Sequence, residues 1–414
     1  MRIVITGGGT GGHVFPAIAV AEELGRQSTD VEILFVGGSK GLEARVVPDA
    51  GYRFASVPAR GLVGKRLLSV PAILWTTLRG IVASYRILSR FNPDVVFATG
   101  GYVSGSVALA GKILRKPLVL HEQNSIPGLT NRMLARIAQE VHLNLPSARC
   151  RFPKRRHLKL SGNPVRVEIL RGDHRRARQE HGLQPGRRTV LILGGSQGAR
   201  SINRASVGAV RALRRRSDLQ FILQTGRRDY RWVMRRLRRG NELISVRPFI
   251  ERMGDAYALA DLVVARAGAT TLAEITACGK PSILVPFPHA AQDHQKINAM
   301  ALVEVGAAAM ISDRRLQGEH LASMIAKLID TPRKLREMSN NALLLARPEA
   351  AEKIAAALLR YDTGNGLVAV TPGRELQRPG RVARRPGKGP RGRAGTRRAH
   401  ERGPRVGDQR GSHS

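Results

Sequence analysis

The sequence is short of several features that mark common protein classes. Two cysteines in 414 residues, Cys150 and Cys278, are too few for a disulfide framework and lack the spacing of a metal site. No apolar run reaches the roughly 18 residues that cross a bilayer, and no apolar signal-peptide core precedes the first strand-like segment. We therefore expect a protein of a reducing cytoplasm without a membrane span.

Acidic and aromatic residues are also scarce. The chain holds 31 Asp/Glu against 69 Lys/Arg, a formal charge of +38, and such an excess can indicate nucleic acid or an anionic membrane as a partner. Residues 361–414 contribute a surplus of nine, and the remaining +29 is spread over the rest of the chain, mostly as arginine. Nucleic-acid modules usually add aromatic platforms to their charge. Because aromatics make up only 4% of the chain, we expect no nucleic-acid partner.

The most informative stretch lies at the amino end, from Ile3 to Leu24. Apolar residues up to Thr6 predict a buried parallel strand, five glycines then surround Thr10, and a helical apolar period begins directly after His13. A strand, glycine turn and helix in this order present free N–H groups to an anion. The glycines also fit the dinucleotide pattern. That pattern needs an acidic residue after the second strand, which here ends in two glycines, so a phosphate-binding loop is favoured over an NAD site.

The rest of the chain alternates short apolar strands with amphipathic helices, which predicts parallel sheets covered on both faces. A second strand–glycine–helix opening at 190–200 repeats the first, so we expect two similar α/β domains that face a cleft. The join is expected near Gly162-Asn163-Pro164. The predicted strands are 3–6, 31–36, 53–57, 95–98, 118–121 and 140–143, then one that starts at 190, and 219–223, 243–246, 262–264 and 282–286.

Two segments depart from this alternation. Residues 65–90 carry an apolar stripe with basic residues around it, which fits either a helix packed on the sheet or a face that binds a membrane surface. After Tyr361 the sequence is dominated by Gly, Pro and Arg without an apolar period, so 362–414 is predicted to be disordered. The stripe consists of Leu74, Leu78, Ile81, Tyr85 and Leu88, with Trp75 beside it, and the basic residues are Lys65, Arg66, Arg79, Arg86 and Arg90.

Several glycine-rich or polar segments follow strand ends, where loop residues often carry function. Read in order from residue 7 to about 300, they are GGGTGGHVFPAIAVAEEL, GGYVSG, HEQN, GNPVR, GGSQGAR, FIERM, RAGATTLAEI and VPFPHAAQDHQKINA. Together these stretches closely resemble the MurG family, which adds N-acetylglucosamine to lipid I to make lipid II in bacterial wall synthesis. The general resemblance runs to about residue 360, and the basic tail has no counterpart in the family.

The resemblance implies a GT-B fold, an α/β architecture of two Rossmann-like, doubly wound parallel-sheet domains that face a cleft. Residues 1–162 would form the acceptor- and membrane-facing domain, and 163–345 would bind the UDP-sugar. Residues 346–361 would form a helix that packs back on the first domain, followed by the disordered tail 362–414.

The resemblance also assigns donor-binding residues. The start of the helix at 269–271 could hold the departing diphosphate on free N–H groups, and Glu274 could accept the ribose hydroxyls. A surface glutamate stabilised by the helix dipole is the alternative for Glu274. By the family pattern Arg166 and Ile250 would frame the uracil, while Asn124, His294 and Gln295 would read the sugar hydroxyls. The full donor set is Thr10, Gly11, Gly12, Asn124, Arg166, Ser196, Ile250, Ala269, Thr270, Thr271, Leu272, Ala273, Glu274, His294 and Gln295.

The acceptor would face the first glycine loop. His13 could take the acceptor hydroxyl's proton or only hydrogen-bond it, as histidine side chains commonly do in catalysis. Glu122 and Tyr102 are rivals for this role, and the sequence does not choose among them. No D-x-D pair or His–Cys spacing is present, so neither a metal nor a cofactor is expected. The acceptor set is Gly9, Thr10, Gly11, Gly12, His13, Gly100, Gly101 and Tyr102.

The predicted function is therefore that of an inverting transferase. It would move N-acetylglucosamine from UDP to the C4 hydroxyl of the muramoyl pentapeptide on undecaprenyl diphosphate. Such an enzyme would work peripherally at the cytoplasmic face of the plasma membrane, on an anionic surface, with cell-wall synthesis proteins as candidate partners. Two alternatives stay open: a GT-B enzyme that glycosylates diacylglycerol, against which HEQN and GGYVSG argue, and a non-catalytic basic protein that binds nucleic acid or membrane without affinity for UDP.

Overall fold

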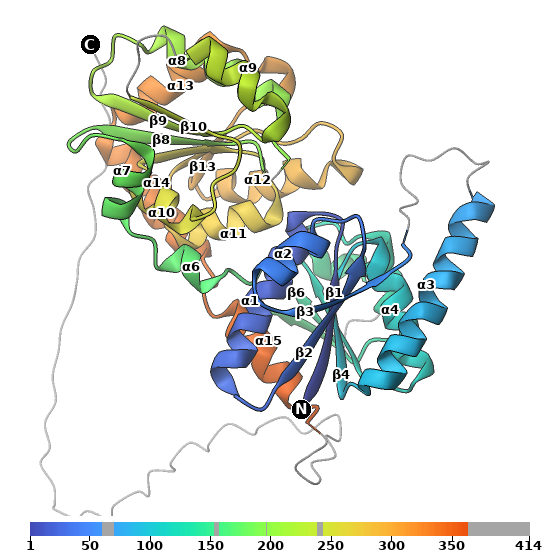
Figure 1. Ribbon diagram of the computed structural model, residues 1–414. Helices are drawn as coiled ribbons and strands as arrows, with labels where there is room; N and C mark the ends of the chain where they lie inside the picture. The colour runs from blue at the N-terminus through green and yellow to red at the C-terminus, as the bar shows by residue number, and fades with distance from the viewer. Residues whose placement is uncertain (60–69, 153–156, 196, 238–242, 363–414) are drawn as a thin grey trace, which may run out of the picture. The chain divides into compact units, whose positions relative to one another are not determined.

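The computed structural model describes residues 1–59, 70–152, 157–195, 197–237 and 243–362. Ser196, Lys65 and Arg66 lie outside these residues, and so does the tail 362–414 that the sequence predicts to be disordered, except for Asp362. The described chain belongs to one unit that contains two parallel sheets (Figure 1).

The first sheet has seven parallel strands in the order β3-β2-β1-β4-β5-β6-β7 (Figure 1). Because β1 pairs with both β2 and β4, the winding direction reverses between β1 and β4. Sheets of this topology bind ligands at the carboxyl ends of the strands beside the reversal, and this place is called the crevice of the sheet. The strands are β1 (Arg2–Gly7), β2 (Glu32–Gly38), β3 (Arg53–Val57), β4 (Val95–Gly100), β5 (Leu118–Glu122), β6 (Glu140–Leu143) and β7 (Leu158–Leu160). The helices are α1 (Gly11–Gln27), α2 (Glu43–Asp49), α3 (Val70–Phe91), α4 (Tyr102–Ile113), α5 (Leu129–Leu134) and the 3-10 turn η2 (Pro146–Arg151).

The second sheet has six parallel strands in the order β10-β9-β8-β11-β12-β13, with the same reversal between β8 and β11. Its strands are β8 (Arg188–Leu193), β9 (Leu219–Gln224), β10 (Ile244–Arg247), β11 (Leu262–Ala265), β12 (Ser282–Leu284) and β13 (Ala308–Met310). The remaining helices are α6 (Val167–Leu170), α7 (His174–His181), α8 (Arg200–Ala212), α9 (Arg227–Leu237), α10 (Met253–Leu259), α11 (Ala269–Ala277), α12 (His294–Glu304), α13 (Gly318–Ile329), α14 (Pro332–Leu345) and α15 (Ala350–Leu359), with 3-10 turns η3 (Ala291–Asp293) and η4 (Asp313–Arg315).

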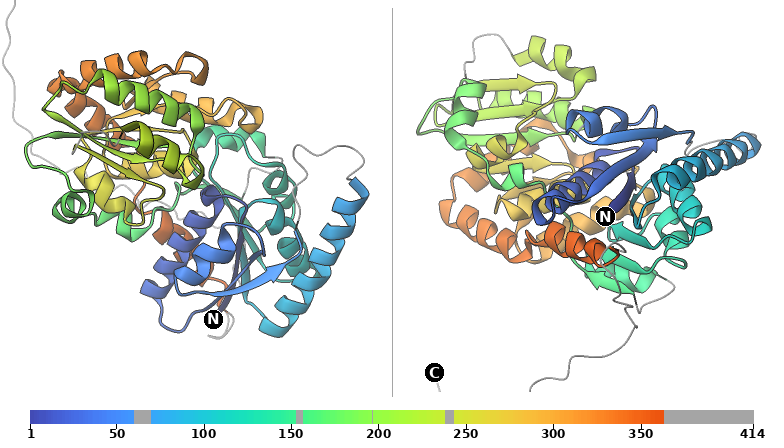
Figure 2. Two further views of the ribbon diagram at one scale, coloured as in Figure 1. Left: turned by 45° about the horizontal axis from the view of Figure 1, so that its top comes forward. Right: turned by 60° about the horizontal axis from the view of Figure 1, so that its bottom comes forward.

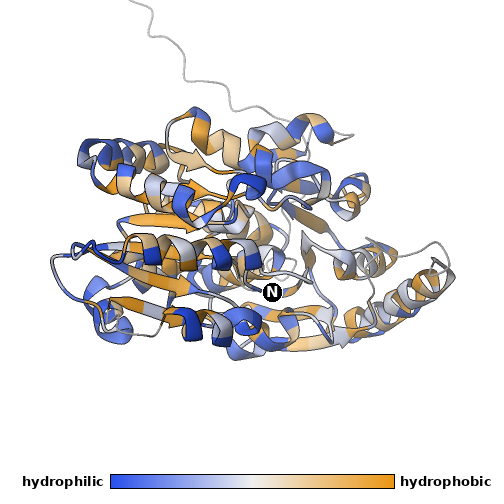
Figure 3. Ribbon diagram, turned by 90° about the horizontal axis from the view of Figure 1, so that it is seen from above, coloured by the Kyte–Doolittle hydropathy of each residue, from blue (hydrophilic) through white to orange (hydrophobic). Residues whose placement is uncertain are grey.

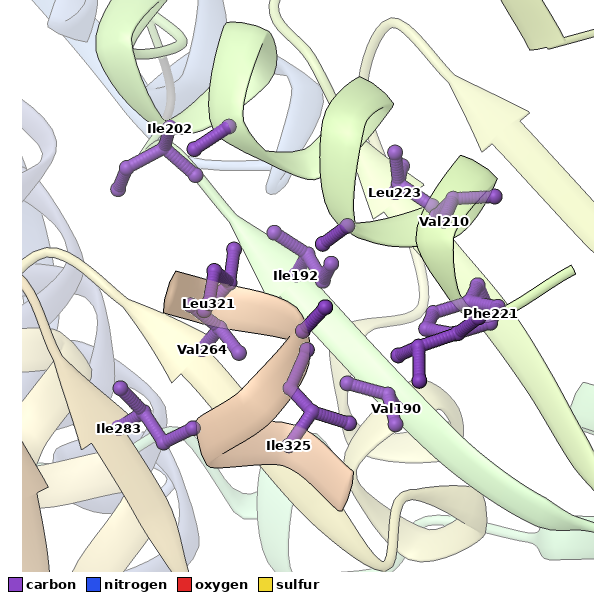
Figure 4. Packing of buried hydrophobic residues seen from close by; sticks show 14 of the residues in the cluster. Val190, Ile192, Ile202, Val210, Phe221, Leu223, Val264, Ile283, Leu321 and Ile325 are labelled. Carbon is purple, nitrogen blue, oxygen red and sulfur yellow. The ribbon is translucent and has the colours of Figure 1, made fainter. Parts of the chain in front are cut away.

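Both faces of each sheet are covered, because successive strand residues point to opposite sides. In β1, Ile3 and Ile5 pack toward α1, whereas Val4 packs in the other cluster with α3 and α4. In β8, Val190 and Ile192 meet α8 and α13, as Figure 4 shows with Leu321 and Ile325. Most strands are accordingly orange in Figure 3, while the helices carry both colours. The prediction of two doubly wound parallel sheets is confirmed.

The last helix of the chain belongs to the core of the first sheet. Figure 1 shows α15 beside α1, and Ile354, Ala355 and Leu358 are buried in the cluster formed by α1 and β1. The chain therefore passes between the two sheets twice, once before α6 and once after α14.

The apolar residues of α3 are partly buried against the domain and partly exposed. Ile73 and Leu88 are buried, whereas Leu74 is 65% and Trp75 62% exposed. The exposed apolar face is completed by Leu78, Val82 and Tyr85. Figure 2 shows the amino-terminal half of this light-blue helix projecting beyond its neighbours. The predicted stripe is thus not a single packing face. Within the described ranges, no helix is long and apolar enough to cross a membrane.

The strand predictions differ from the structure mainly at the ends, and two strands were missed. Strands β7 and β13 have three residues each. The segment at 158–160 is an edge strand that alternates with a lysine, and the segment at 308–310 is rich in alanine, a weak strand former. The predicted strand 282–286 ends at Leu284, before Pro286, which has no N–H for the ladder.

Candidate functional site

Two glycine loops meet in backbone contact at the crevice of the first sheet. The N–H of Gly8, after β1, donates to the carbonyl of Gly100 at the end of β4, with N···O 3.3 Å. A Cβ on Gly101 would clash with the carbonyl oxygen of Gly8, and one on Gly100 would lie 3.1 Å from the His13 ring. Only glycine permits this approach. The predicted acceptor residues are therefore brought together from two different strand ends.

Helix α1 begins directly after this contact. Thr10 is its N-cap and makes no side-chain capping bond, so the Thr10 side chain does not occupy the first-turn N–H groups at Gly11 and Gly12. Tyr102 opens α4 beside Gly9, 41% exposed. Burial of its ring, and then the negative charge of Glu43, raise the pKa of Tyr102, which leaves its hydroxyl protonated at neutral pH.

Glu43 holds the glycine loop in place and was missed by the sequence analysis. Its carboxylate is almost fully buried and accepts hydrogen bonds from the N–H groups of Gly9 (2.9 Å) and Gly38 (3.1 Å). The sequence has no acid at the end of the second strand, and this later carboxylate binds the loop itself. The sequence signal of this role is a glutamate that follows a run of glycines, because the backbone amides of such a loop need hydrogen-bond acceptors.

His13 projects from the first turn of α1 into the crevice. Its Nδ1 lies 3.0 Å from the backbone carbonyl oxygen of Thr99 and 3.0 Å from Oε1 of Gln123. A backbone carbonyl can only accept, so the neutral ring carries its proton on Nδ1, and Nε2 keeps a lone pair. The Thr99 hydroxyl also donates to the His13 carbonyl (2.8 Å), which fixes the backbone of the same turn.

Glu122 has a different character. Its carboxylate is 1% exposed and receives four hydrogen bonds. One oxygen accepts from the N–H (2.9 Å) and the side-chain amide (3.3 Å) of Asn124. The other accepts from the N–H of Gly128 (3.1 Å) and from Asn131 (2.9 Å). These bonds occupy the acceptor positions of the carboxylate, so Glu122 and Asn124 shape the loop between β5 and α5.

The donor candidates from Ala269 to Glu274 lie on α11, which follows β11 of the second sheet, whereas Thr10, Gly11, Gly12 and Asn124 belong to the first domain. Gly268 is the N-cap and has no side chain, so the N–H groups from Ala269 to Thr271 open the helix without a cap. Leu272 is buried in the core, and Ala273 packs against the same cluster. At the start of the helix these two residues can therefore offer a ligand only their backbone atoms. The Thr270 hydroxyl donates to the carbonyl of Gly12 (3.3 Å), which joins this helix to the acceptor loop.

Glu274 lies one turn into α11 and is 8% exposed, so the alternative of a surface glutamate is wrong. The hydroxyl of Tyr257 donates to it (3.1 Å). Burial raises the pKa of the Glu274 carboxyl, and the positive charge of Arg166 opposes that rise. A buried carboxylate with one protein donor keeps capacity for further hydroxyl donors.

Arg166 lies between the two sheets. Its guanidinium stacks on Phe15 of α1, 4.4 Å from the ring centroid, and forms an ion pair with Glu168 (2.6 Å). Its Nε is buried without a hydrogen-bond partner in the described chain. The N–H of Ile250 is already bound by Gln224 (2.9 Å). Sequence reasoning missed Phe15, because an aromatic residue in an apolar helix gives no signal of a guanidinium above it.

A third contact joins the two sheets near α12. The side chain of Asn298 accepts from the N–H of Ser125 (3.1 Å), the residue that follows Asn124. His294 and Gln295 open the same helix, and Gln295 accepts from the N–H of Phe287 (3.0 Å). Of the predicted donor residues, Ser196 alone lies outside the described ranges. Within those ranges, His, Cys, Asp and Glu form no cluster of three that could hold a metal ion.

His121, on β5, is fully buried behind the site. Its Nε2 lies 3.0 Å from the carbonyl oxygen of Gly162, and its Nδ1 lies 3.1 Å from Nε2 of Gln123. Desolvation by burial lowers the pKa of His121 to about 3, against the opposing effect of the Gly162 carbonyl. The ring is therefore neutral at physiological pH.

Comparisons with known proteins agree with this arrangement. Residues 3–143 match the glycosyltransferase family 28 N-terminal domain and residues 189–354 match the family's C-terminal domain. The chain is 44% identical to the UDP-N-acetylglucosamine–N-acetylmuramyl-(pentapeptide) pyrophosphoryl-undecaprenol N-acetylglucosamine transferase of Moorella thermoacetica, over 87% of this chain and 99% of that protein. The protein of the same name from Myxococcus xanthus is 44% identical, over 86% of this chain and 91% of its own.

Solved structures show the same likeness. Acinetobacter baumannii MurG aligns with a TM-score of 0.66 and 29% identity, over 87% of this chain and 99% of that one. A UDP-GlcNAc 2-epimerase from Neisseria meningitidis, bound to UDP-GlcNAc, aligns at 0.64 with 14% identity, over 87% of this chain and 100% of that one. The second likeness concerns the fold alone. The predicted GT-B fold is confirmed.

Acidification should destabilise the fold through His121. The unfolded imidazole binds a proton below about pH 6.5, whereas the folded protein leaves it neutral down to about pH 3. The unfolded state therefore binds more protons in this window, and the free energy of unfolding falls by about 1.4 kcal/mol per pH unit from this group. Urea unfolding between about pH 6.5 and about pH 5 should show a shallower slope for His121→Gln than for the parent.

His320→Gln is the matched control, since His320 is exposed on α13. It should keep the parental slope. Equal slopes for His121→Gln and the parent would show that His121 is not held neutral in the folded protein.

Proposed function

Because the chain belongs to glycosyltransferase family 28 and to its MurG members, we propose that each sheet crevice holds one of the two substrates. The enzyme transfers N-acetylglucosamine from UDP-N-acetylglucosamine to the N-acetylmuramyl-(pentapeptide) of pyrophosphoryl-undecaprenol, which converts lipid I to lipid II. The lipid-linked acceptor binds at the first crevice and the UDP-sugar at the second. The observation that carries this assignment is the hydrogen bond from Thr270 to Gly12, which joins the two loops.

The donor is held at the start of α11. Its uncapped first-turn N–H groups and the positive end of its dipole bind the diphosphate. Glu274 accepts from the ribose hydroxyls, for which it has free acceptor capacity beside Tyr257. Arg166 has an unpartnered Nε to offer the uracil, and Ile250 borders the base on its other side. Asn124, His294 and Gln295 face the sugar.

The acceptor diphosphate is held by the N–H groups from Thr10 to Gly12, with Gly100, Gly101 and Tyr102 as the opposite wall. His13 Nε2 then lies free to accept, since Nδ1 faces the Thr99 carbonyl. The C4 hydroxyl of the muramoyl sugar is the proposed nucleophile.

Transfer is proposed as one displacement. The hydroxyl oxygen attacks the anomeric carbon while its proton passes to His13 Nε2, and UDP leaves with the electron pair of the broken C–O bond. The configuration inverts from α to β. The first-turn amides of α11 stabilise the charge that develops on the leaving diphosphate. Glu122 is the less suitable candidate for this role, because its acceptor positions are already occupied.

Anchoring of the acceptor in a membrane requires the first domain to reach the lipid surface. The exposed apolar face of α3 suits this role, since it lies beside the exposed Arg79, Arg86 and Arg90. We therefore place the enzyme peripherally at the cytoplasmic face of the plasma membrane, docked through α3. A diacylglycerol acceptor and a purely nucleic-acid-binding role have no support in the relatives, whose names specify the undecaprenol acceptor.

Glu274→Gln should weaken UDP-N-acetylglucosamine binding by about 30-fold, because one oxygen that accepts from the ribose becomes a donor. Loss of hydrogen bonds to a charged group is worth about 2 kcal/mol. Titration calorimetry measures the affinity, with Glu319→Gln as control, an exposed glutamate in the first turn of α13. A folded Glu274→Gln protein with parental affinity would remove Glu274 from the donor site.

His13→Gln should lower kcat by about 10²-fold or more, the usual contribution of a general base. Donor affinity should hardly change, because both hydrogen-bond partners of the His13 ring, Thr99 and Gln123, belong to the first domain. Steady-state rates with lipid I, next to calorimetry with the donor, test both points. A large loss of kcat in folded Glu122→Gln together with normal turnover in His13→Gln would move the base to Glu122.

Arg79→Gln/Arg86→Gln should release the full-length protein from anionic vesicles without changing its affinity for UDP-N-acetylglucosamine. Each basic residue near such a surface contributes about 1 kcal/mol, so binding should fall by about 30-fold. The control is Arg235→Gln/Arg236→Gln on α9, which removes the same charge from the second domain. Equal losses in the two double variants would mean that overall charge binds the vesicles and that α3 is not the docking face.

A further inference from the structure

A continuous chain of hydrogen bonds runs from His13 into the interior of the first domain. Oε1 of Gln123 faces Nδ1 of His13 (3.0 Å), and Nε2 of Gln123 faces both the Thr99 carbonyl (2.7 Å) and Nδ1 of His121 (3.1 Å). Nε2 of His121 faces the Gly162 carbonyl (3.0 Å). Thr99, Gln123 and His121 are each at most 1% exposed, so water does not compete for these bonds.

The direction of every bond in this chain follows from its two backbone carbonyls, which can only accept. His121 must donate from Nε2 to Gly162, so its Nδ1 is an acceptor. The group of Gln123 that faces that Nδ1 and the Thr99 carbonyl must then be the NH₂, which leaves its oxygen toward His13. His13 must therefore donate from Nδ1. His13 and His121 consequently carry their protons on opposite ring nitrogens.

This arrangement acts on the base at two stages. Before transfer it keeps the proton on Nδ1, so that the lone pair on Nε2 faces the substrate crevice. After transfer the ring is a cation, and the Nδ1–H then points at two oxygen acceptors, Gln123 Oε1 and Thr99 O, which stabilise the charge. Gln123 cannot rotate its amide to follow the proton, because its NH₂ is held by two other acceptors.

The far end of the chain lies at the junction between the two sheets. Gly162 has φ +93, and a Cβ there would clash with the side chain of Arg347, which lies in the second connection between the sheets. The backbone at Gly162, whose carbonyl orients His121, thus packs closely against the second connection between the sheets. Burial keeps the His121 ring neutral, with its pKa lowered to about 3, so the chain does not switch with pH in the physiological range.

We infer that Gln123 and His121 are positioning residues for the transfer, which hold His13 in the Nδ1–H form with a bare Nε2. This inference rests on the proposed role of His13 as the base. It assigns functions to two residues of the H-E-Q-N segment for which the sequence provided only a resemblance. Neither side chain is proposed to touch a substrate.

The first test reads the tautomers directly. ¹⁵N-histidine-labelled protein without substrates should show a protonated Nδ1 and unprotonated Nε2 for His13, and the opposite pattern for His121. The signals are assigned by their loss in His13→Gln and His121→Gln. A protonated Nε2 on neutral His13 would overturn the inference. Because no turnover is involved, this result is independent of whether His13 is the base, which the turnover of His13→Gln decides.

The second test is Gln123→Met, which keeps the volume of the side chain and removes all of its hydrogen bonds. We expect mixed tautomers at His13 and a fall in kcat of about tenfold or more, the scale for one hydrogen bond to a charged group. The affinity for UDP-N-acetylglucosamine should not change. If Gln123→Met keeps the pure Nδ1–H form and the parental kcat, the Thr99 carbonyl alone positions the ring and the role of Gln123 is refuted.

Gln220→Met is the matched control. Gln220 is also a fully buried amide, on β9 of the second sheet, where it donates to the Gln184 carbonyl (3.1 Å) and the Thr189 hydroxyl (2.9 Å). Its replacement carries the same loss of buried hydrogen bonds away from His13. It should lower stability and leave both the His13 signals and kcat at parental values. A fall in kcat equal to that of Gln123→Met would reduce the effect at Gln123 to general destabilisation.

Discussion

The backbone contact between the loops that follow β1 and β4 is the constraint on which the first domain's site depends. Once Gly8 donates to Gly100, the amino end of α1 and the first turn of α4 have little freedom to move apart. His13 is carried into the crevice by that position, and Tyr102 is set opposite it. Glu43 secures the same loop from the third side through the N–H of Gly9. These two hydrogen bonds thus fix a surface made almost wholly of glycine backbone.

The second sheet has the same topology, but its polar groups are arranged differently. Its crevice also lies where the strand order reverses, and a helix again starts there without a side-chain cap. The polar groups, however, are placed farther in. Glu274 lies below the helix start, where Tyr257 fixes it and Arg166 offsets the cost of its burial. The candidate site of the first domain consists mainly of backbone amides and one imidazole, while that of the second includes the buried carboxyl group of Glu274.

Much of the fold and part of the site could be predicted from the sequence. Apolar strands between amphipathic helices predict two parallel sheets, and glycines after β1 and β4 predict the crevice between them. The side-chain contacts that hold the site together could not be predicted in this way. Glu43 binds the backbone amide of Gly9 and Gln123 binds the imidazole of His13, and both of these partners are remote in sequence. Phe15 reads as an ordinary core aromatic until the guanidinium of Arg166 is placed above it. Pairings of this kind depend on tertiary geometry, which periodicity does not encode.

The packing of α15 against α1 has a consequence for how the chain is made. Synthesis proceeds from the amino end, and domains generally begin to fold as they emerge. Here the layer between β1 and α1 lacks Ile354, Ala355 and Leu358 until nearly all of the described chain has left the ribosome. The amino-terminal sheet must therefore wait, with apolar side chains of α1 uncovered, while the whole carboxyl-terminal sheet is translated. The first domain is therefore completed late, through contacts between residues far apart in the sequence, when α15 packs onto α1.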